Sequence, residues 1–484
     1  MTRNQYFEVE EVFLGTTFDD FTLNPQCSVA VTRDSIPLKT KFSKNVSLNL
    51  PVVSANMGTV TGPAMAIAMA QEGGIGILPR GGVTISSEAN WVKEVKRAEN
   101  FIIEKPHTIH SYQTLAEARN LMDLHKIGTL LVLSETGKFA GILSAKRKMM
   151  LCGSYDGERK IADIMTERNQ CGYTTRESIS SAEEAAEELA KHDKEKLVWL
   201  SEDMRIRGLI TTKDIGNLLH HKWANKDAKG RLIVGAAIGV TGDYIERASE
   251  LIKAGVDVIV MDTAHAHNQK VVLPAIREFR KHFQQFELVC GNVATYEGAE
   301  FLSEIADGIK VGIGPGAGCR TRNETGVGVG QLDAVRSAFL ASSVPLIADG
   351  GIKKTGDIAK ALCMGASSVM LGEFLAGTDE SPGEIINDPA KGRIKKYRGE
   401  TSPQAKLSIA GSAENIKNVE GQEKDIEYRG SVKDILRGIR EGLQSMVSFM
   451  GEESLASVRD KVNEEPWRYF RPASSATQKE SFKK

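Results

Sequence analysis

The chain has 484 residues, which is long for one compact domain, so we expect two domains. Acidic and basic residues nearly cancel, to a net charge of −1, which gives no argument for a nucleic-acid or membrane partner. The six cysteines form no CxxC pair, which disfavours a disulfide framework or a zinc site and fits a reducing compartment. The N-terminal stretch is acidic, and no apolar run approaches the roughly 18 residues of a membrane span, so we expect a cytoplasmic protein.

Two buried strands are predicted near the start of the chain. Residues 50–58 (LPVVSANMG) form a continuous apolar run that ends in small residues, and residues 75–78 form a second run. Between them, residues 62–73 show Ala and Met at helical spacing. A strand, a helix and a strand without polar alternation indicate a parallel sheet that is covered on both faces.

The composition changes between residues 95 and 225, where Glu, Lys and Arg become frequent. Two similar units follow one another in this stretch, each with an amphipathic helix and two apolar strands. The first unit has its helix at 115–126, and the second at 182–192. An internal repeat of roughly 65 residues indicates two copies of one module, inserted as a separate domain. A structural spacer is the alternative interpretation.

The α/β pattern resumes after residue 226 and adds six strands to the two early ones. Eight β/α units predict the fold class α/β, a (β/α)8 TIM barrel made of residues 1–94 and 226–484 with an insertion at 95–225. Active sites of such barrels lie at the carboxyl ends of the strands. The six later strands are predicted at residues 231–239, 256–264, 288–295, 309–313, 344–351 and 367–373, with helices at 243–254 and 268–282.

A glycine-rich loop after the strand at 309–313 carries a cysteine. Glycines stand at positions 312, 314, 316 and 318, Cys319 follows them, and Thr321 comes two residues later. Glycine suits a backbone that needs positive φ or that closely approaches a ligand. A cysteine at the tip of a strand-end loop is a candidate nucleophile. The alternative is a buried, inert cysteine in a glycine-rich turn.

The sequence GIGPGAGC-R-T, followed by TGVG, resembles the catalytic loop of the IMP dehydrogenase/GMP reductase family, and the resemblance covers nearly the whole chain. It implies that Cys319 adds to C2 of a purine nucleotide, that hydride passes between C2 and a nicotinamide, and that a covalent thioimidate (E-XMP) lies between. A proton relay through Thr321 is expected as well. Arg320 and Arg322, if they point inward, would help to keep the thiol ionised.

The ends of the last two strands are predicted to bind the substrate. Barrels of this kind bind phosphate at the loops after strands seven and eight. Asp349 suits a ribose diol, with a helix N-cap as the alternative interpretation, and the resemblance assigns Tyr397 to the phosphate. The predicted substrate-binding residues are Asp349, Gly350, Gly351, Gly372, Tyr397, Gly314 and Gly316.

The resemblance also implies a site for a nicotinamide dinucleotide. Asp262 matches the residue that contacts the nicotinamide ribose. His265 and His267 lie just beyond it without a third metal ligand, so we interpret them as polar loop residues and expect no transition-metal site. The predicted cofactor-binding residues are Asp262, Asn292 and Gly312. In the dehydrogenase case a monovalent cation is expected at Gly314, Gly316 and Cys319.

The two units between residues 95 and 225 resemble a tandem pair of CBS modules, which in this family bind adenine or guanine nucleotides and regulate. In such modules a Thr/Ser-x-x-Asp motif after the last strand holds a ribose. Thr211 and Asp214 match this motif, whereas Arg147 takes the place of the aspartate in the first unit. We therefore expect one competent site for ATP or GTP, or none. A homotetramer, or an octamer formed through these modules, is expected by resemblance.

Residues 400–420 (ETSPQAKLSIAGSAENIKNVE) bear on the direction of the reaction. Dehydrogenases of the family resemble one another in a flap whose Arg-Tyr pair activates water, and this interval contains neither residue type. It ends at Glu420, which in the family works with the threonine to protonate the leaving amine of GMP. We therefore expect a GMP reductase that uses NADPH. The tandem modules and the sequence KKYRG at 395–399 favour the alternative, an IMP dehydrogenase that uses NAD with K+.

Several positions depart from the family pattern. Ala317 replaces a serine and loses a hydroxyl for the phosphate, and Glu373 replaces a small residue and would repel a phosphate if it pointed inward. Gly58, Glu400 and Thr401 depart as well. These changes support a third interpretation, a nucleotide-binding paralogue with weak or altered catalysis.

Overall fold

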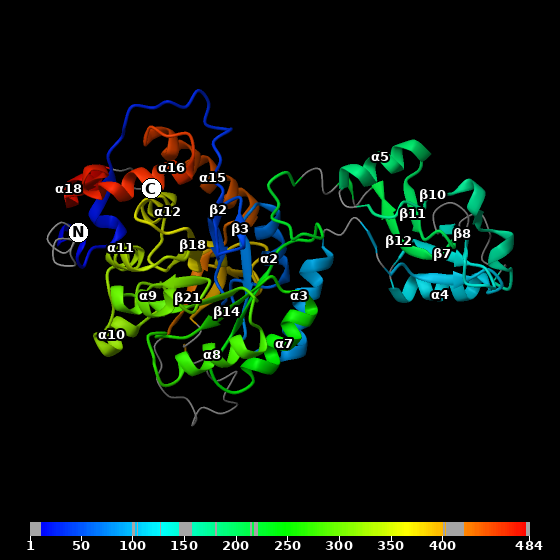
Figure 1. Ribbon diagram of the computed structural model, residues 1–484, viewed down its shortest axis with the longest axis horizontal. Coiled ribbons are helices and arrows are strands. Elements are labelled where there is room, and N and C mark those ends of the chain that lie inside the picture. Colours follow the sequence, from blue (N-terminus) through cyan, green and yellow to red (C-terminus); the bar gives the residue numbers. More distant parts are fainter. Residues whose placement is uncertain are drawn as a thin grey trace. The chain divides into compact units, whose positions relative to one another are not determined.

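The computed structural model describes residues 11–98, 102–103, 105–125, 127–144, 157–179, 182–212, 215–216, 221–399, 402 and 421–480. The chain divides into two compact units (Figure 1). One comprises Met1–Ala98, Trp223–Asp227 and Leu232–Lys484, and the other comprises Glu99–Lys222 and Ala228–Arg231. The second unit begins at Glu99 and ends at Arg231, so its bounds differ by a few residues from those of the predicted insertion at 95–225. None of the described helices is both long and apolar enough to cross a membrane.

Eight parallel strands close into a barrel at the centre of the first unit, as the sequence predicts. They pair in the order β13-β14-β15-β16-β17-β18-β4-β5, and the barrel closes where β13 pairs with β5. The second unit is inserted between these two strands of the chain. The strands are β4 (Val52–Ser54), β5 (Ile75–Leu78), β13 (Gly235–Ile238), β14 (Val258–Asp262), β15 (Leu288–Val293), β16 (Gly308–Val311), β17 (Leu346–Asp349) and β18 (Ser368–Leu371).

The barrel strands are buried except at Asp262, Asn292 and Asp349, which are half-buried, because side chains fill the interior and helices cover the outside. Every residue of β5, β13, β16 and β18 is buried, which explains the apolar runs without polar alternation. Most of the strands are shorter than predicted. The strand predicted at 309–313 ends at Val311, because Gly312 takes φ +146°, outside the extended region.

Helices follow the strands and surround the barrel in Figure 1. Helix α2 packs on β4 and β5 and also against α3 and α15, so it is covered on several sides. This explains its Ala- and Met-rich sequence. Contact with β5 is close, since a Cβ on Gly76 would lie 2.5 Å from Ala66 Cα. The outer helices are α2 (Pro63–Gln71), α3 (Ile85–Arg97), α7 (Tyr244–Ala254), α8 (Val272–His282), α9 (Tyr296–Ser303), α11 (Gln331–Ala341), α12 (Thr355–Cys363) and α15 (Val432–Phe449).

The second unit contains the same β-α-β-β motif twice. In each copy the first strand pairs parallel with the second, and the second pairs antiparallel with the third. The register shifts between Val132 and Leu133 in one copy and between Trp199 and Leu200 in the other. The copies are β6 (Thr108–His110), α4 (Leu115–His125), β7 (Thr129–Leu133) and β8 (Phe139–Ser144), then β10 (Gly172–Thr174), α5 (Ala182–His192), β11 (Lys196–Leu200) and β12 (Ile206–Thr211).

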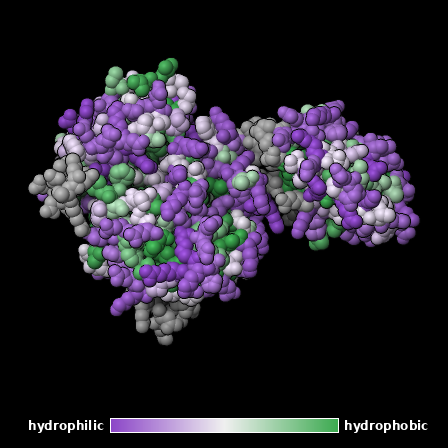
Figure 2. Space-filling model, viewed as in Figure 1, coloured by the Kyte–Doolittle hydropathy of each residue, from purple (hydrophilic) through white to green (hydrophobic). Residues whose placement is uncertain are grey.

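The two copies share one apolar cluster, to which Leu131 and Phe139 contribute from the first and Val198 and Leu200 from the second. This shared core explains why both copies belong to one compact unit. The visible surface of the second unit in Figure 2 is mostly hydrophilic, in keeping with the charged composition of residues 95–225. The unit also contains β9 (Thr166–Glu167), η4 (Ile161–Asp163) and η5 (Arg168–Gln170).

A three-stranded antiparallel sheet follows β18 and packs beside the carboxyl ends of the barrel strands. It consists of β19 (Ile386–Asp388), β20 (Gly392–Arg398) and β21 (Glu423–Glu427). The buried Lys395 fixes it to the barrel unit by donating to the carbonyls of Thr378 (2.9 Å) and Ser381 (2.6 Å). The remaining elements are η1 (Glu11–Phe13), η2 (Phe18–Asp20), β1 (Phe21–Leu23), β2 (Thr40–Lys41), β3 (Ser47–Leu48), α10 (Thr321–Thr325), α13 (Glu373–Ala376), α16 (Leu455–Glu464), α17 (Pro466–Tyr469), β22 (Phe470–Pro472) and α18 (Ser475–Glu480).

Candidate active site

A cavity of about 590 Å³ lies at the carboxyl ends of the barrel strands. Its walls come from the loops after β16, β17 and β18 and from strands β20 and β21. The predicted site residues among its lining residues are Gly316, Cys319, Asp349, Gly350, Gly351, Gly372 and Tyr397. The cysteine and the strand-end glycines, which are far apart in the sequence, therefore face one space.

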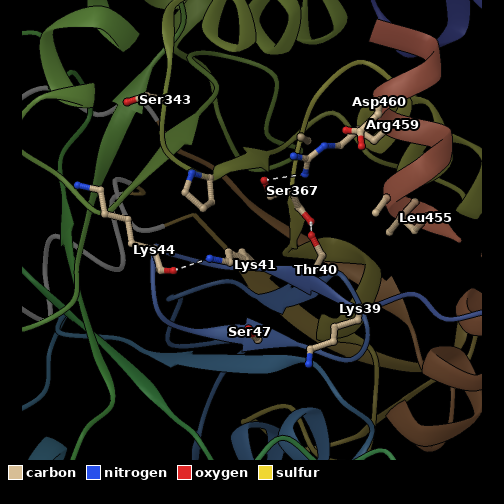
Figure 3. A pocket seen from close by; sticks show the side chains of 13 residues that line it. Lys39, Thr40, Lys41, Lys44, Ser47, Ser343, Ser367, Leu455, Arg459 and Asp460 are labelled. Atoms are coloured by element: carbon tan, nitrogen blue, oxygen red, sulfur yellow. Dashed lines mark hydrogen bonds between the residues drawn. The ribbon is translucent and has the colours of Figure 1, made fainter.

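Another cavity, of about 480 Å³, lies at the opposite, amino-terminal ends of the strands (Figure 3). Arg459 points into it and donates to Ser367 Oγ (3.0 Å), and Lys41 donates to the Lys44 carbonyl (2.9 Å). Asp460 is the acidic residue among the described side chains around it, and no cysteine is among them. Barrel enzymes place their chemistry at the carboxyl ends, so the cavity beside Cys319 is the candidate active site.

The cysteine loop, residues 312–320, connects β16 to α10. The half-buried Cys319 thiol donates a hydrogen bond to Thr321 Oγ1 at 3.1 Å. The backbone N–H of Cys319 donates to the Gly316 carbonyl (2.9 Å), which closes the tip of the loop. The thiol and the hydroxyl predicted to act together are thus in direct contact.

Glycine is required where the cysteine loop leaves β16. Gly312 has φ +146°, and a Cβ there would lie 2.1 Å from the Asp349 carbonyl oxygen. Gly314 has φ +86°, and a Cβ there would lie 2.6 Å from Arg322 Cγ. Gly314 therefore shapes the loop, but it is absent from the described lining of the cavity.

The two arginines of the cysteine region do not provide the inward charge that the sequence suggested. Arg320 forms an ion pair with Glu324 (2.5 Å) one turn along α10. The Arg322 guanidinium donates to the Val329 carbonyl on the exposed surface. The described contacts therefore hold the two guanidinium groups at Glu324 and at Val329, and they bring neither group to the thiol.

A buried lysine joins three barrel strands below the cavity. Lys310 Nζ lies 2.7 Å from Asp262 Oδ1 and 2.8 Å from Asp349 Oδ2, and the lysine is 3% exposed. Asn56 Nδ2 donates to the second oxygen of Asp262 (2.9 Å), and Asn292 Nδ2 donates to Asp349 Oδ2 (3.0 Å). The predicted cofactor residue Asp262 and the predicted ribose residue Asp349 are therefore held by one cation.

These contacts fix the charge state of the buried groups. Burial alone would raise the pKa of Asp262, but the Lys310 ammonium and the Asn56 amide outweigh it, and the pKa of Asp262 lies below its ordinary value. Burial alone would lower the pKa of Lys310, but the carboxylates of Asp262 and Asp349 raise it. Lys310, near the start of the cysteine loop, therefore stays protonated, and Asp262, at the end of β14, stays ionised.

Two polar atoms beside this network are buried without a partner among the described residues. They are Asn292 Oδ1 and Thr263 Oγ1, at the ends of β15 and β14. Asn292 Nδ2 is occupied, since it also donates to the Gly312 carbonyl (2.7 Å). A free amide oxygen and a free hydroxyl next to the Asp262 carboxylate suit the carboxamide and the ribose of a nicotinamide nucleotide, so the residues present fit such a cofactor.

One end of the cavity is formed mainly by backbone. Gly350 and Gly351 have φ +91° and +75°, and Gly372 follows β18. Tyr397, which is 3% exposed, reaches this end from β20 and donates to Met57 Sδ (3.7 Å). A Cβ on Gly372 would lie 2.9 Å from the Tyr397 hydroxyl. The glycine therefore gives the hydroxyl access to the cavity.

Glu373 is paired, although the sequence left it as a repulsive charge. Lys424 Nζ, from β21, lies 2.5 Å from Glu373 Oε1, and both side chains line the cavity. Ala317 also lines the cavity, and its methyl group offers no hydrogen bond. The positively charged residues around this end are Lys353, Lys424 and Arg429.

Some predicted site residues are not part of this cavity. Glu420, the predicted proton donor, and Asp214, with Arg147, Glu400 and Thr401, lie outside the described residues. Thr211 ends β12 in the second unit. No group of three metal-binding side chains occurs in the described part of the chain, and His267 packs against the Phe301 ring, with 5.1 Å between centroids.

Sequence reasoning missed Lys310, Asn56 and Lys424. A signal for Lys310 was present, because it is the charged residue of an otherwise apolar buried strand, and such a residue needs partners. Asn56 lies in the ANM sequence at 55–57, which resembles the family's strand end that faces the dinucleotide and the purine, but the sequence assigned no role to Asn56 itself. Nothing in the sequence around Lys424 shows that it meets Glu373.

Comparisons with known proteins agree with this geometry. The model of the IMP dehydrogenase / GMP reductase domain matches residues 15–483. An inosine-5'-monophosphate dehydrogenase of Nitrosopumilus maritimus is 41% identical and covers 93% of this chain and 94% of its own, and one of Bacillus subtilis is 40% identical, at 93% and 92%. The structure resembles a cysteine-to-alanine variant of Trypanosoma brucei GMP reductase in complex with guanosine 5'-monophosphate, with TM-score 0.86, 35% identity and 97% of each chain covered.

A GMP reductase of the same organism in complex with guanosine 5'-triphosphate matches with TM-score 0.76 and 33% identity, over 95% of this chain and 98% of that one. The matches to dehydrogenases and to reductases both extend over almost the whole chain. Together with the barrel and the cysteine loop, they show that the chain belongs to the IMP dehydrogenase/GMP reductase family of NAD(P)-dependent oxidoreductases.

Proposed function

We propose that the protein is a GMP reductase, which converts GMP to IMP and ammonia through a covalent bond between Cys319 and C2 of the purine. The observation that carries the proposal is the contact between the Cys319 thiol and the Thr321 hydroxyl (3.1 Å) beside a cavity that is lined by Cys319 and by the strand-end glycines. Covalent catalysis requires a nucleophile with a route for its proton, and the Thr321 hydroxyl can relay a proton because it both accepts and donates hydrogen bonds.

The substrate is bound along the cavity. The ribose hydroxyls bond to Asp349, which Lys310 and Asn292 hold in place. The phosphate lies against the backbone N–H groups of Gly350, Gly351 and Gly372 and the hydroxyl of Tyr397. The proposed reaction requires the base to lie beside Cys319, which lines the same cavity.

The cofactor is a nicotinamide dinucleotide, and the second substrate of the proposed reaction is NADPH, which supplies hydride to C2. Asp262, Asn292 and Thr263 would hold its nicotinamide half, because they offer a carboxylate, a free amide oxygen and a free hydroxyl at neighbouring strand ends. Gly312 contributes by letting the backbone approach Asp349 closely.

The chemical steps of the reduction balance as follows. The Cys319 thiolate adds to C2, the bond between C2 and the exocyclic nitrogen breaks, and the amine leaves as ammonia after taking a proton. Thr321 and Glu420 are the proposed proton-transfer groups. Hydride then adds to C2, the carbon–sulfur bond breaks, and IMP leaves with the thiolate restored.

The reductive direction is supported by residues 400–420, which contain neither Arg nor Tyr and so lack the pair that would activate water. The tandem insertion does not argue against a reductase, because the match to a reductase of Trypanosoma brucei covers 97% of this chain and 97% of that one. IMP dehydrogenase, with NAD as oxidant, is the second candidate, favoured by relatives of that name at 40–41% identity.

Absorbance at 340 nm tests the direction. The protein is mixed with GMP and NADPH, and separately with IMP and NAD. The proposal predicts loss of NADPH with formation of IMP. A rise of NADH with formation of XMP would replace it by the dehydrogenase. Inactivity in both mixtures, with nucleotide binding retained, would indicate a paralogue with altered catalysis.

The second unit is proposed to bind a regulatory ATP or GTP. Support comes from its duplicated β-α-β-β motif and from Thr211 at the end of β12, in the second copy. Asp214 would complete the ribose contact. Equilibrium binding of ATP and GTP to the unaltered protein and to Thr211→Val measures this, and equal affinity in both proteins would contradict it.

A further inference from the structure

We propose that Lys424 binds the phosphate of the substrate directly and that Glu373 is the residue that positions it. The proposal rests on the purine nucleotide function proposed above. It gives Glu373 a positioning role, whereas the sequence suggested that this residue would repel a phosphate if it pointed inward. In this chain the glutamate and the lysine act together as a side-chain anion site at the end of the cavity.

The strand pairing brings Lys424 to the cavity. Tyr397 and Lys424 are directly opposite each other in the antiparallel pair β20–β21, so their side chains leave the same face of the sheet. Lys424 Nζ lies 6.0 Å from the centre of the Tyr397 ring. The tyrosine hydroxyl lies next to Gly372. One face of the sheet therefore directs a hydroxyl and an ammonium group at the end of the cavity.

Among the described residues that line this end, few other side chains can donate to a phosphate. Gly350, Gly351 and Gly372 offer only backbone N–H groups, and Ala317 offers no hydroxyl. Two other cations line the cavity, but Lys353 pairs with Asp19 (3.3 Å) and has a side chain 74% exposed. Arg429 donates to the Phe374 carbonyl (3.1 Å). Arg429 thus uses one N–H group on a neutral carbonyl, and Lys424 is the lining cation that shares a face of the sheet with Tyr397, so Lys424 is the proposed partner of a phosphate dianion.

Glu373 keeps Lys424 at this position until a phosphate arrives. The two side chains are 32% and 33% exposed, and ion pairs at such positions contribute little net stability because water competes with them. The ammonium group can therefore exchange one carboxylate for a doubly charged phosphate. Glu373 follows Gly372 directly, so Lys424 Nζ is already held beside the proposed phosphate site.

The proposal predicts that Lys424 distinguishes nucleotides from nucleosides. Calorimetry with GMP and with guanosine, without cofactor, measures both affinities while no turnover occurs. Lys424→Met is expected to weaken GMP binding about 10- to 100-fold and to leave guanosine binding within about 2-fold. An equal loss for both ligands, or no loss for GMP, would overturn the proposal.

The double variant separates direct binding from simple neutralisation. If Lys424 only neutralises Glu373, then Glu373→Gln combined with Lys424→Met removes both charges and restores the GMP affinity of the unaltered protein. If Lys424 contacts the phosphate, the double variant still binds GMP at least about 10-fold more weakly. Restored affinity therefore overturns the proposal, and persistent weakness supports it.

Lys396→Met is the matched control. Lys396 belongs to β20, the strand that pairs with β21, and forms an ion pair with Asp425 (2.6 Å), but it faces the opposite side of the sheet. Its loss is expected to leave GMP affinity unchanged, and thermal unfolding of both variants checks that the sheet is folded. If the unaltered protein binds neither GMP nor IMP, the proposed function fails and this proposal with it; if it binds them and Lys424→Met does so equally, this proposal alone fails.

Discussion

The backbone of Cys319 pairs with that of Gly421 in an antiparallel bridge, which ties the cysteine loop to the segment that leads into β21. The next residue strengthens the connection, since Gln422 N–H donates to the Gly318 carbonyl and Gly399 N–H donates to the Gln422 carbonyl, both at 3.0 Å. The loop that carries the nucleophile is therefore held from outside the barrel. Its position depends on the sheet that also carries Tyr397 and Lys424.

The bridge predicts that Gln422→Pro impairs catalysis. Proline removes the N–H that bonds to the Gly318 carbonyl, so the cysteine loop loses its support and the thiol is misplaced. We expect kcat/KM to fall about 100-fold in the assay that proves productive. Gln422→Ala is the control, because it removes only the side-chain bond to the Ala317 carbonyl (3.1 Å). Equal activity of the two variants would show that the bridge does not position Cys319.

Replacement of Lys310 by methionine is predicted to be strongly destabilising. It leaves Asp262 and Asp349 without the cation that joins them, and breaking such a buried pair costs roughly 3–5 kcal/mol. The free energy of unfolding in urea measures the loss. Lys396→Met removes a lysine from an exposed ion pair and should cost no more than about 1 kcal/mol. A similar cost for both lysines would contradict the structural role of Lys310.

The same variant predicts a pH dependence. In the folded state the pKa of Asp262 lies below its ordinary value of 3.8, which applies to the unfolded chain. The ionised Asp262 therefore stabilises the fold fully above the unfolded pKa, and this contribution is lost as the pH falls through the folded pKa. In Lys310→Met burial dominates instead, and the Asp262 pKa rises. The difference in unfolding free energy between the unaltered protein and Lys310→Met should therefore be largest near pH 7 and shrink towards pH 4. A difference that does not change with pH would contradict this.

Gly312 is predicted to tolerate no side chain. Gly312→Ala combines φ +146° with a Cβ placed 2.1 Å from the Asp349 carbonyl oxygen, so we expect a loss of roughly 3 kcal/mol or more. Gly242→Ala is the control, since Gly242 also has positive φ (+71°) but no atom within 4 Å of the added Cβ. It should cost about 1 kcal/mol. Thermal unfolding of both proteins checks the comparison, and equal losses would contradict it.

Asn225 is predicted to stabilise the barrel although it lies beside the insertion. It is 6% exposed, accepts from Asn49 N–H (3.1 Å) and donates to the carbonyls of Gly73 and Gly74. Asn225→Ala should therefore lower the free energy of unfolding by roughly 2–4 kcal/mol. Asn268→Ala, which frees only exposed N–H groups, should cost less than about 1 kcal/mol. Equal effects would show that Asn225 does not stabilise the barrel.

Much of the fold follows from the sequence, because buried parallel strands need apolar side chains on both faces. The runs at 75–78 and 367–373 were recognisable for that reason. Because Cys319, Asp349 and Gly372 follow or end barrel strands, they were then predicted to lie at the carboxyl end of the barrel. Strand ends were less predictable. They depend on single backbone angles, such as φ at Gly312.

The charge pairs of the site could not be predicted, because they join segments that only the folded chain brings together. Lys310 on β16 meets Asp349 on the neighbouring strand β17 and Asp262 on β14, which lies beyond β15. Glu373 meets Lys424 only because β21 packs beside the end of β18. The orientations of the Arg320 and Arg322 side chains could not be predicted either, since they depend on the short helix α10, which begins after the cysteine.

The most direct test of the account is mass spectrometry of the protein quenched in acid during turnover with its nucleotide substrate. The account predicts an added mass equal to the purine nucleotide intermediate on the peptide that contains Cys319, and no such mass and no turnover in Cys319→Ala. Full activity of Cys319→Ala, or turnover with the adduct on another residue, would contradict it.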